Sequence, residues 1–191
     1  MPYHFGRVLS AFALTVALSS AAGLAAGSPG MESTPVPLPP KPDFSSMQFM
    51  IGTWTCSNKS SRRPTTSRST ETYSMDPTGY WLDLKTTDDK TSWFPYHTTG
   101  LDKFTFDSES RRWMDVYAGS LGDYALTWST GWTGNTIAWH DAYFTPSMIA
   151  NIVSESPFTV TKVSDSKMTL HSTFKEKSGT TITYNATCNK T

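Results

Sequence analysis

The sequence contains little cysteine, little histidine and no net charge. Its 191 residues include 2 cysteines and 4 histidines, and 16 acidic residues balance 16 basic ones. A near-neutral protein lacks the broad positive field that attracts nucleic acid or an anionic membrane. We therefore expect no nucleic-acid partner.

The sequence also lacks a hydrophobic run long enough to cross a membrane as a helix. Its most apolar run, Val8 to Leu18, is shorter than the roughly 20 residues that such a span needs. Arg7 precedes this run and small residues follow it up to residue 26, which is the order of a secretory signal peptide. We predict a signal peptide over residues 1–26, with an uncleaved anchor as the alternative, and a secreted or periplasmic protein.

Residues 27–43 contain too few apolar side chains to bury a core. Prolines recur there among serine, glycine and threonine, a composition that favours an extended, solvated tether. The predicted folded unit is therefore residues 44–191, one domain of ordinary size.

Motifs of catalysis and metal binding are missing as well. The sequence contains neither a Gly-x-Ser-x-Gly elbow nor a His-Glu-x-x-His helix site, and acidic pairs such as Asp88-Asp89 lie in turn-like segments. The histidines beyond the signal peptide are His97, His140 and His171, and none has the spacing of a metal site on a helix. We predict no catalytic residue, no metal site and no cofactor, and an enzyme is the less favoured class.

The two cysteines, Cys56 and Cys188, lie near the two ends of the predicted domain. In an exported protein such a pair predicts a disulfide, and two free buried thiols are the alternative. Closing a loop of this length would stabilise the fold by up to about 5 kcal/mol through loop-closure entropy.

Short period-two runs recur along the domain, whereas no segment sustains the 3.6-residue period of an amphipathic helix. A single helical turn over residues 43–50 precedes the first run, Phe49 to Asn58. Turn signals separate the runs, and further strands are expected near residues 68–74 and 147–154. We predict an all-β fold, a single antiparallel meander of about ten strands that closes into a barrel, because closure removes unpaired edges.

The cysteines also predict how such a barrel closes. If the first and last strands pair antiparallel with Cys56 opposite Cys188, then Tyr184 lies opposite Ser60. The first strand must then run beyond Asn58, or the disulfide lies at a frayed rim. Parallel pairing of the first and last strands would change this register, so both the antiparallel and the parallel arrangement stay open.

The first predicted strand opens with the motif Phe49-Met50-Ile51-Gly52-Thr53-Trp54. A Gly-x-Trp start to an all-antiparallel chain resembles the calycin superfamily, which includes lipocalin-like and fatty-acid-binding-like barrels. Later motifs add a resemblance to a secreted bacterial branch of lipocalin-like barrels, over about residues 44–191: Gly100-Leu101-Asp102, Arg112-Trp113, Gly131-Trp132 and Ala138-Trp139-His140.

This resemblance implies roles for particular residues. Gly52 would permit a tight turn beneath one end of the barrel, because glycine admits backbone angles that other residues do not. Trp54 would plug that end. Members of the superfamily stack a basic side chain of a late strand on this Trp, and Lys162 or Lys175 would supply it here.

A barrel of about ten strands is wider than the roughly eight that side chains fill, which leaves room for a ligand. The resemblance and the alternating aromatic residues favour a barrel that binds a small, mostly apolar molecule. The residues expected to contact this ligand share the apolar faces of their strands: Tyr80, Leu82, Leu84, Phe104, Phe106, Trp128, Trp139 and Met168.

Two other functions stay open. A filled barrel would be a structural or interaction module, and the run from Trp113 to Tyr117, apolar on both faces, predicts a protein partner near Trp113 and Tyr117. The resemblance also allows a haem-binding or isomerase-type barrel. Some members bind haem through one late-strand histidine, and His171 has that position, whereas an enzyme would need His140 or His171 inside the barrel.

Overall fold

The computed structural model describes residues 37–144 and 152–191. The chain divides into two units, Met1–Leu38 and Pro39–Thr191, and the regular elements lie in the second. The predicted signal peptide and residues 27–36 of the predicted tether lie outside the described residues, and residues 37–44 have no regular secondary structure. The described residues include no helix that is long and apolar enough to span a membrane.

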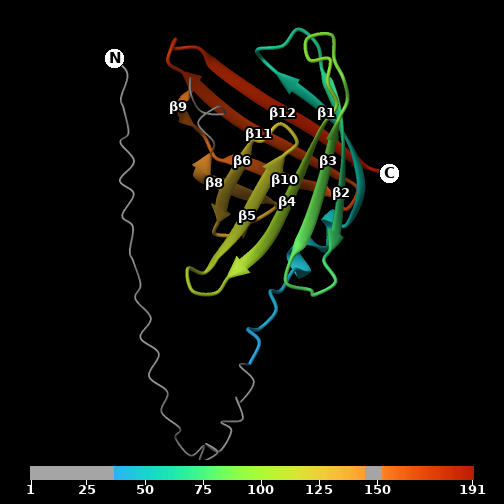
Figure 1. Ribbon diagram of the computed structural model, residues 1–191, viewed down its shortest axis with the longest axis vertical. Coiled ribbons are helices and arrows are strands. Elements are labelled where there is room, and N and C mark those ends of the chain that lie inside the picture. Colours follow the sequence, from blue (N-terminus) through green and yellow to red (C-terminus); the bar gives the residue numbers. More distant parts are fainter. Residues whose placement is uncertain (1–36, 145–151) are drawn as a thin grey trace, which may run out of the picture. The chain divides into compact units, whose positions relative to one another are not determined.

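A short 3-10 helix, η1 (Ser45–Met50), precedes the strands and lies within the predicted helical turn at residues 43–50 (Figure 1). The strands that follow are β1 (Gly52–Ser60), β2 (Ser67–Met75), β3 (Leu82–Asp88), β4 (Thr98–Asp107), β5 (Arg112–Gly119), β6 (Tyr124–Ser129), β7 (Trp132–Thr133), β8 (Thr136–Phe144), β9 (Ile152–Glu155), β10 (Phe158–Ser164), β11 (Lys167–Glu176) and β12 (Thr181–Lys190).

These strands form one antiparallel sheet that closes on itself. Neighbours along the chain pair with each other from β1 to β6, β6 pairs with β8, and β10 pairs with β11 and β11 with β12. The ring is completed where β8 pairs with β10 and β12 pairs with β1. The short strands β7 and β9 extend the pairing of β8 and β11. The predicted all-β meander barrel of about ten strands is confirmed.

The register between β1 and β12 is the antiparallel one of the two arrangements that the sequence left open. The strands are antiparallel, Cys56 lies opposite Cys188, and Ser60 lies opposite Tyr184. The first strand therefore runs beyond Asn58, and the disulfide lies within the sheet and not at a frayed rim. Both sulfur-bearing residues are fully buried and joined by the predicted disulfide, which is compatible with an exported protein.

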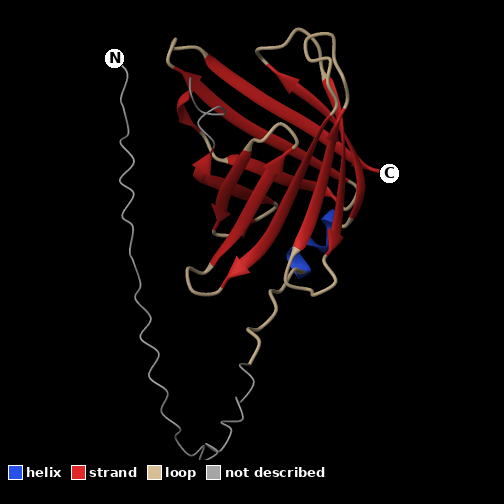
Figure 2. Cartoon of the chain, viewed as in Figure 1, coloured by secondary structure: helices blue, strands red, loops and turns tan. Residues whose placement is uncertain are grey.

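One end of the barrel is closed by Trp54 and η1. Trp54 is fully buried, and its Nε1 donates a hydrogen bond to the Met50 carbonyl oxygen at 2.7 Å. Phe44 and Met47 are also buried here, and Figure 2 shows the helix at one end of the ring of strands. The Phe44 ring lies 5.3 Å from that of Trp113, so the segment before β1 packs into the far wall of the barrel.

A lysine stacks on Trp54, but neither of the two expected ones. Lys190 lies opposite Trp54 in the β1–β12 register, and its Nζ is 5.3 Å from the centre of the Trp54 ring. The same Nζ donates to the Phe49 carbonyl oxygen at 2.8 Å. Lys162 instead lies over the Phe49 ring, and Lys175 is exposed. The cysteine register places Lys190 and Trp54 opposite each other, because each is two residues from its cysteine.

Gly52 makes this closure sterically feasible. Its φ is +123°, a conformation that other residues rarely adopt. A Cβ atom at this position would lie only 2.9 Å from Cε of Lys190. The backbone turn is therefore the main reason for glycine here, since the flexible end of Lys190 can shift to admit a Cβ atom.

We expect the double variant Cys56→Ser/Cys188→Ser to be less stable by about 2–5 kcal/mol, because the disulfide closes a loop with a sequence separation of 132. Urea denaturation measures the change in the free energy of unfolding. The neighbouring cross-strand pair provides the control, since Ser57→Ala/Thr187→Ala keeps the disulfide and is expected to change stability little. Equal unfolding midpoints for the parent and the cysteine-free variant would contradict a stabilising role of the bridge.

Candidate functional site

The barrel encloses a cavity of about 880 Å³. This volume lies in the range of roughly 300–1,000 Å³ that is usual for sites of small molecules. At its inner end lie Met47 and Met50 of η1, whereas three of its exposed lining residues, Arg62, Arg63 and Thr65, come from the loop between β1 and β2. The cavity is thus closed by the plugged end and opens near this loop. Its volume does not fit a barrel filled by its own side chains.

Four of the eight residues expected to contact a ligand line this cavity. They are Leu82, Leu84, Phe104 and Trp139, all buried. Leu82 lies opposite Phe104 in the β3–β4 ladder, and the Phe104 ring lies 5.3 Å from that of Trp139. The alternation of apolar residues along β3, β4 and β8 therefore gave the correct inner face.

The other four do not line it. Tyr80 precedes β3, and its hydroxyl donates to the Pro39 carbonyl oxygen at 2.6 Å, outside the barrel wall. Phe106 is 36% exposed at the end of β4, where its ring packs on Trp113. Met168 is fully buried in the core but is not a cavity residue.

Trp128 lies on the outer face, because the inner face of β6 is formed by small residues. Ala125, Thr127 and Ser129 are buried, whereas Tyr124 is 47% exposed. The Trp128 ring stacks on His140 at 4.6 Å and on the Arg112 guanidinium at 4.0 Å. The large aromatic residues of this strand suggested the opposite assignment of its two faces.

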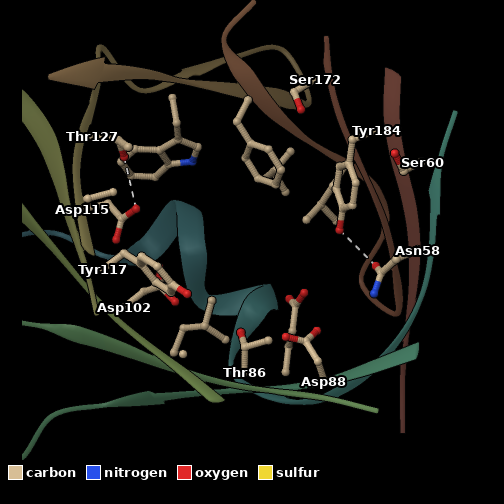
Figure 3. Close-up of a pocket in the computed structure, with 18 of the residues that line it drawn as sticks. Asn58, Ser60, Thr86, Asp88, Asp102, Asp115, Tyr117, Thr127, Ser172 and Tyr184 are labelled. Carbon is tan, nitrogen blue, oxygen red and sulfur yellow. Dashed lines mark hydrogen bonds between the residues drawn. The ribbon is translucent and has the colours of Figure 1, made fainter. Parts of the chain in front are cut away.

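Acidic side chains on the inner face are the main feature that the sequence analysis missed. Glu71 on β2, Asp102 on β4 and Asp115 on β5 all line the cavity. Glu71 is buried and accepts a hydrogen bond from the Tyr73 hydroxyl at 3.0 Å, and Asp115 accepts one from the Thr127 hydroxyl at 3.1 Å. Figure 3 shows Asp102 and Asp115 on the same side of the cavity as Tyr117.

The alternation of side chains along each strand shows that these acids face inward. Each is two residues from an aromatic side chain of the inner face: Glu71 from Tyr73, Asp102 from Phe104, and Asp115 from Tyr117. Side chains two residues apart point to the same side of a strand. Charge suggested a solvated position, but the aromatic neighbours place the carboxyl groups inside.

Gly100 leaves space for the Tyr117 ring at the cavity wall. Gly100 is buried on the inner face of β4, and a Cβ atom there would lie 2.7 Å from Cε2 of Tyr117. The Tyr117 hydroxyl donates to Asp123 at 2.8 Å. Gly100 and Asp102, which share the motif Gly100-Leu101-Asp102, thus both face the cavity.

Burial raises the pKa of the cavity acids. It raises the pKa of Glu71 to about 7, although the hydrogen bond from Tyr73 opposes the shift. Burial, and then the charges of Asp115 and Glu71, raises the pKa of Asp102. Burial likewise raises the pKa of Asp115, and it raises that of Asp141 to about 6. These groups lose protons near neutral pH, well above the ordinary range of carboxylic acids.

The basic residues of the cavity lie at its mouth. Arg62 forms an ion pair with Glu176, and the Arg63 guanidinium lies 4.3 Å from the centre of the Trp93 ring. Both arginines are exposed. Within the described lining, no lysine or histidine faces the inner acids.

The histidines beyond the predicted signal peptide do not reach the cavity. His171 is exposed, and its Nδ1 lies 2.8 Å from the side-chain oxygen of Asn185. His140 stacks on Trp128 outside the barrel, and His97 is exposed. His171 and His140 therefore lie outside the cavity, and haem binding through His171 stays a prediction.

Trp113 and Tyr117 do not themselves form the expected outer surface, because both side chains point inward. Trp113 is 8% exposed, and Tyr117 lines the cavity. The apolar side chains on the outer face are those of the alternate residues, such as Val116, which is 45% exposed. A protein partner for this outer face stays a prediction.

One group in the described residues has the composition of a metal site, namely Cys56, Cys188 and Glu71. Their ligand atoms lie within 4.8 Å of one another. Both sulfurs are bonded to each other in the disulfide, so they cannot act as thiolate ligands. The arrangement therefore does not serve as a metal centre in the oxidised protein.

No family model matches the chain, and no curated protein matches its sequence. Among solved structures, the chain is similar to a de novo designed fluorescence-activating beta barrel. The two share 14% sequence identity with a TM-score of 0.39, and the match covers 75% of this chain and 95% of the designed one. The function must therefore be inferred from the cavity itself.

We predict that the protein loses stability as the pH rises from 5 to 8. In the unfolded chain these carboxyl groups ionise near pH 4, whereas the folded protein keeps their protons to about pH 7. The folded state thus binds more protons in this interval, and the free energy of unfolding falls as pH increases. Asp88, Asp141, Tyr73 and Tyr117 face the same space and supply no compensating positive charge.

Melting temperatures at pH 5, 6, 7 and 8 test this prediction. The isosteric variant Asp102→Asn/Asp115→Asn is expected to have a flatter pH profile and a higher melting temperature than the parent at pH 8. Asp83→Asn is the control, because Asp83 pairs with Lys103 on the outer face. Parallel profiles for the parent and the double variant would show that the two carboxyl groups do not titrate as described.

Proposed function

We propose that the protein is an exported β-barrel that binds a small, mostly apolar molecule inside the barrel. The observation that supports this proposal is the cavity of about 880 Å³, closed at the plugged end. A filled barrel would give no such space, and a purely structural role would not require it.

The inner part of the cavity supplies the apolar contacts. Residues from both halves of the sheet line it: Met47, Met50, Leu82, Ile137, Trp139, Val160 and Leu170. These side chains are buried, so a ligand in contact with them is removed from water. Each Å² of apolar ligand surface buried there stabilises the complex by about 25 cal/mol.

The mouth lies at the opposite end from η1. The Arg63 guanidinium stacks on Trp93, and the Trp93 ring lies 6.2 Å from that of Phe94. These residues belong to the loops that follow β1 and β3. A ligand would pass between these two loops to reach the apolar interior.

Export and kinship with the calycin superfamily are parts of the same proposal. The disulfide between Cys56 and Cys188 and the predicted signal peptide support export. Gly52, Trp54 and Lys190 support the kinship, because they provide the strained glycine, the plugging tryptophan and the stacked basic residue that the resemblance implies. The proposal involves no resident cofactor and no catalytic step.

Native mass spectrometry of the protein purified from its own source tests the proposal directly. A reproducible extra mass that disappears on denaturation would support a binding barrel and give the class of its ligand. A bare native mass, together with no binding of apolar probes, would argue for a structural module.

A change in cavity size provides an independent test. We expect Ala125→Phe to weaken binding of the fluorescent probe N-phenyl-1-naphthylamine by about tenfold, equivalent to about 1.4 kcal/mol. The reason is that Ala125 is buried and lines the cavity, so a phenyl ring would occupy ligand space. Probe titrations followed by fluorescence measure the dissociation constant.

The neighbouring residue provides the matched control. Leu126 pairs with Val116 on the outer face of the sheet. Leu126→Phe therefore adds a ring at the adjacent position without entering the cavity, and it is expected to leave probe binding unchanged. Equal weakening by both substitutions would place the probe outside the barrel.

A further inference from the structure

The inner acids of the cavity have no positive partner in the described chain. Glu71, Asp102 and Asp115 come from three different strands, and burial separates them from bulk water. The cationic lining residues are Arg62 and Arg63 at the mouth, which contact Glu176 and Trp93 respectively. Carboxylates of one charge sign that share a poorly solvated space repel each other.

Two oxygen atoms facing the cavity make no hydrogen bond within the described chain, and the same is true of the indole nitrogens of two further lining residues, Trp93 and Trp132. One is Oδ1 of Asp115, whose other oxygen accepts from Thr127. The second is Oγ of Ser172 on β11, a residue that is 1% exposed and lines the same cavity. Buried polar groups are normally paired, so unpaired ones that face a cavity indicate a bound molecule.

These two groups lie on opposite walls. Figure 3 shows Asp102, Asp115 and Tyr117 on one side of the cavity, and Ser172 and Tyr184 on the other. The Tyr184 hydroxyl is already used, since it donates to Asn58 at 3.1 Å. A molecule that lies between the walls can therefore reach the acids at one side and the free serine hydroxyl at the other.

Aromatic rings surround the acids. Tyr73 is next to Glu71 on the inner face of β2, and Phe104 lies directly opposite Asp115 in the β4–β5 ladder. Tyr117 lies opposite Asp102 in the same ladder. The face of an aromatic ring attracts a cation, and this attraction increases when the cation is removed from water.

From this arrangement we infer that the ligand is an organic cation, in which a protonated amine or quaternary ammonium group is carried on an apolar body. The cationic group lies among Glu71, Asp102 and Asp115, and the apolar body fills the inner cavity. This inference rests on the proposed function and makes it more specific. A ligand carboxylate placed among these acids would be repelled once they are ionised, so a fatty acid is a poorer fit to this part of the cavity.

The inference has a second measurable consequence. A cation that enters among partly protonated carboxyl groups favours their ionised forms, so binding releases protons. Binding should therefore tighten as the pH rises from 6 to 8. The groups that face the cation are the three inner acids with Asp88, Asp141, Tyr73 and Tyr117, and the hydroxyl groups stay neutral over this range.

Three ligands with one apolar skeleton test the inference by calorimetry at pH 7.5: 2-(2-naphthyl)ethylamine, 2-(2-naphthyl)ethanol and 2-naphthylacetate. We expect the amine to bind at least about tenfold more tightly than the alcohol, which corresponds to about 1.4 kcal/mol, and the carboxylate to bind most weakly. Equal affinities for amine and alcohol would overturn the inference but leave the proposed function intact. Binding of none of the three would overturn the proposed function itself.

Variants separate charge recognition from folding. In Asp102→Asn/Asp115→Asn, the amine is expected to bind no better than the alcohol, while the affinity for the alcohol is retained. Glu71→Gln is expected to reduce the preference for the amine independently. Asp83→Asn on the outer face is expected to change neither the affinity for the amine nor that for the alcohol. Retained preference for the amine in both cavity variants would contradict the inference. So would a rise in melting temperature with CaCl₂ alone, since that would make the acids a metal site.

Discussion

Antiparallel pairing of β1 with β12 converts an open sheet into a closed barrel, and the other features of the fold depend on it. The same register sets Cys56 opposite Cys188 and Trp54 opposite Lys190. One covalent bond and one cation–aromatic contact thus reinforce the seam at adjacent inward positions. Without this pairing both edge strands would expose unpaired backbone groups, and the interior would be open along its whole length.

The interior combines groups that oppose each other energetically. Apolar side chains around η1 favour exclusion of water, whereas Glu71, Asp102 and Asp115 lose solvation when water is excluded. A fold selected for stability alone would carry asparagine or leucine at these positions. Several carboxyl groups beside aromatic rings are typical of a site whose ligand compensates for the lost solvation of those groups. Stability and ligand binding thus make different demands on the same residues.

Alternation of side chains allowed much of this structure to be predicted from the sequence. It gave the barrel and the inward direction of Leu84 and Trp139, whereas the sense of the closing pair was left open and only the cysteines suggested its register. It failed where both faces of a strand had plausible inner residues, as at Trp128, since only the neighbouring strands decide which face is inside. The acids were missed because a charged residue in a strand is usually solvated, and burial of Asp115 depends on contacts distant in sequence.

The plug made by Trp54 and η1 also determines how the cavity exchanges its contents. Within the described residues the mouth at the β1–β2 loop lies opposite the plug, so a second molecule that enters there cannot displace a bound one through the plugged end. Exchange must then follow spontaneous escape of the first molecule, at a rate independent of the concentration of competitor. If the proposed ligand binds in this cavity, the plug therefore favours slower exchange than a channel open at both ends would allow.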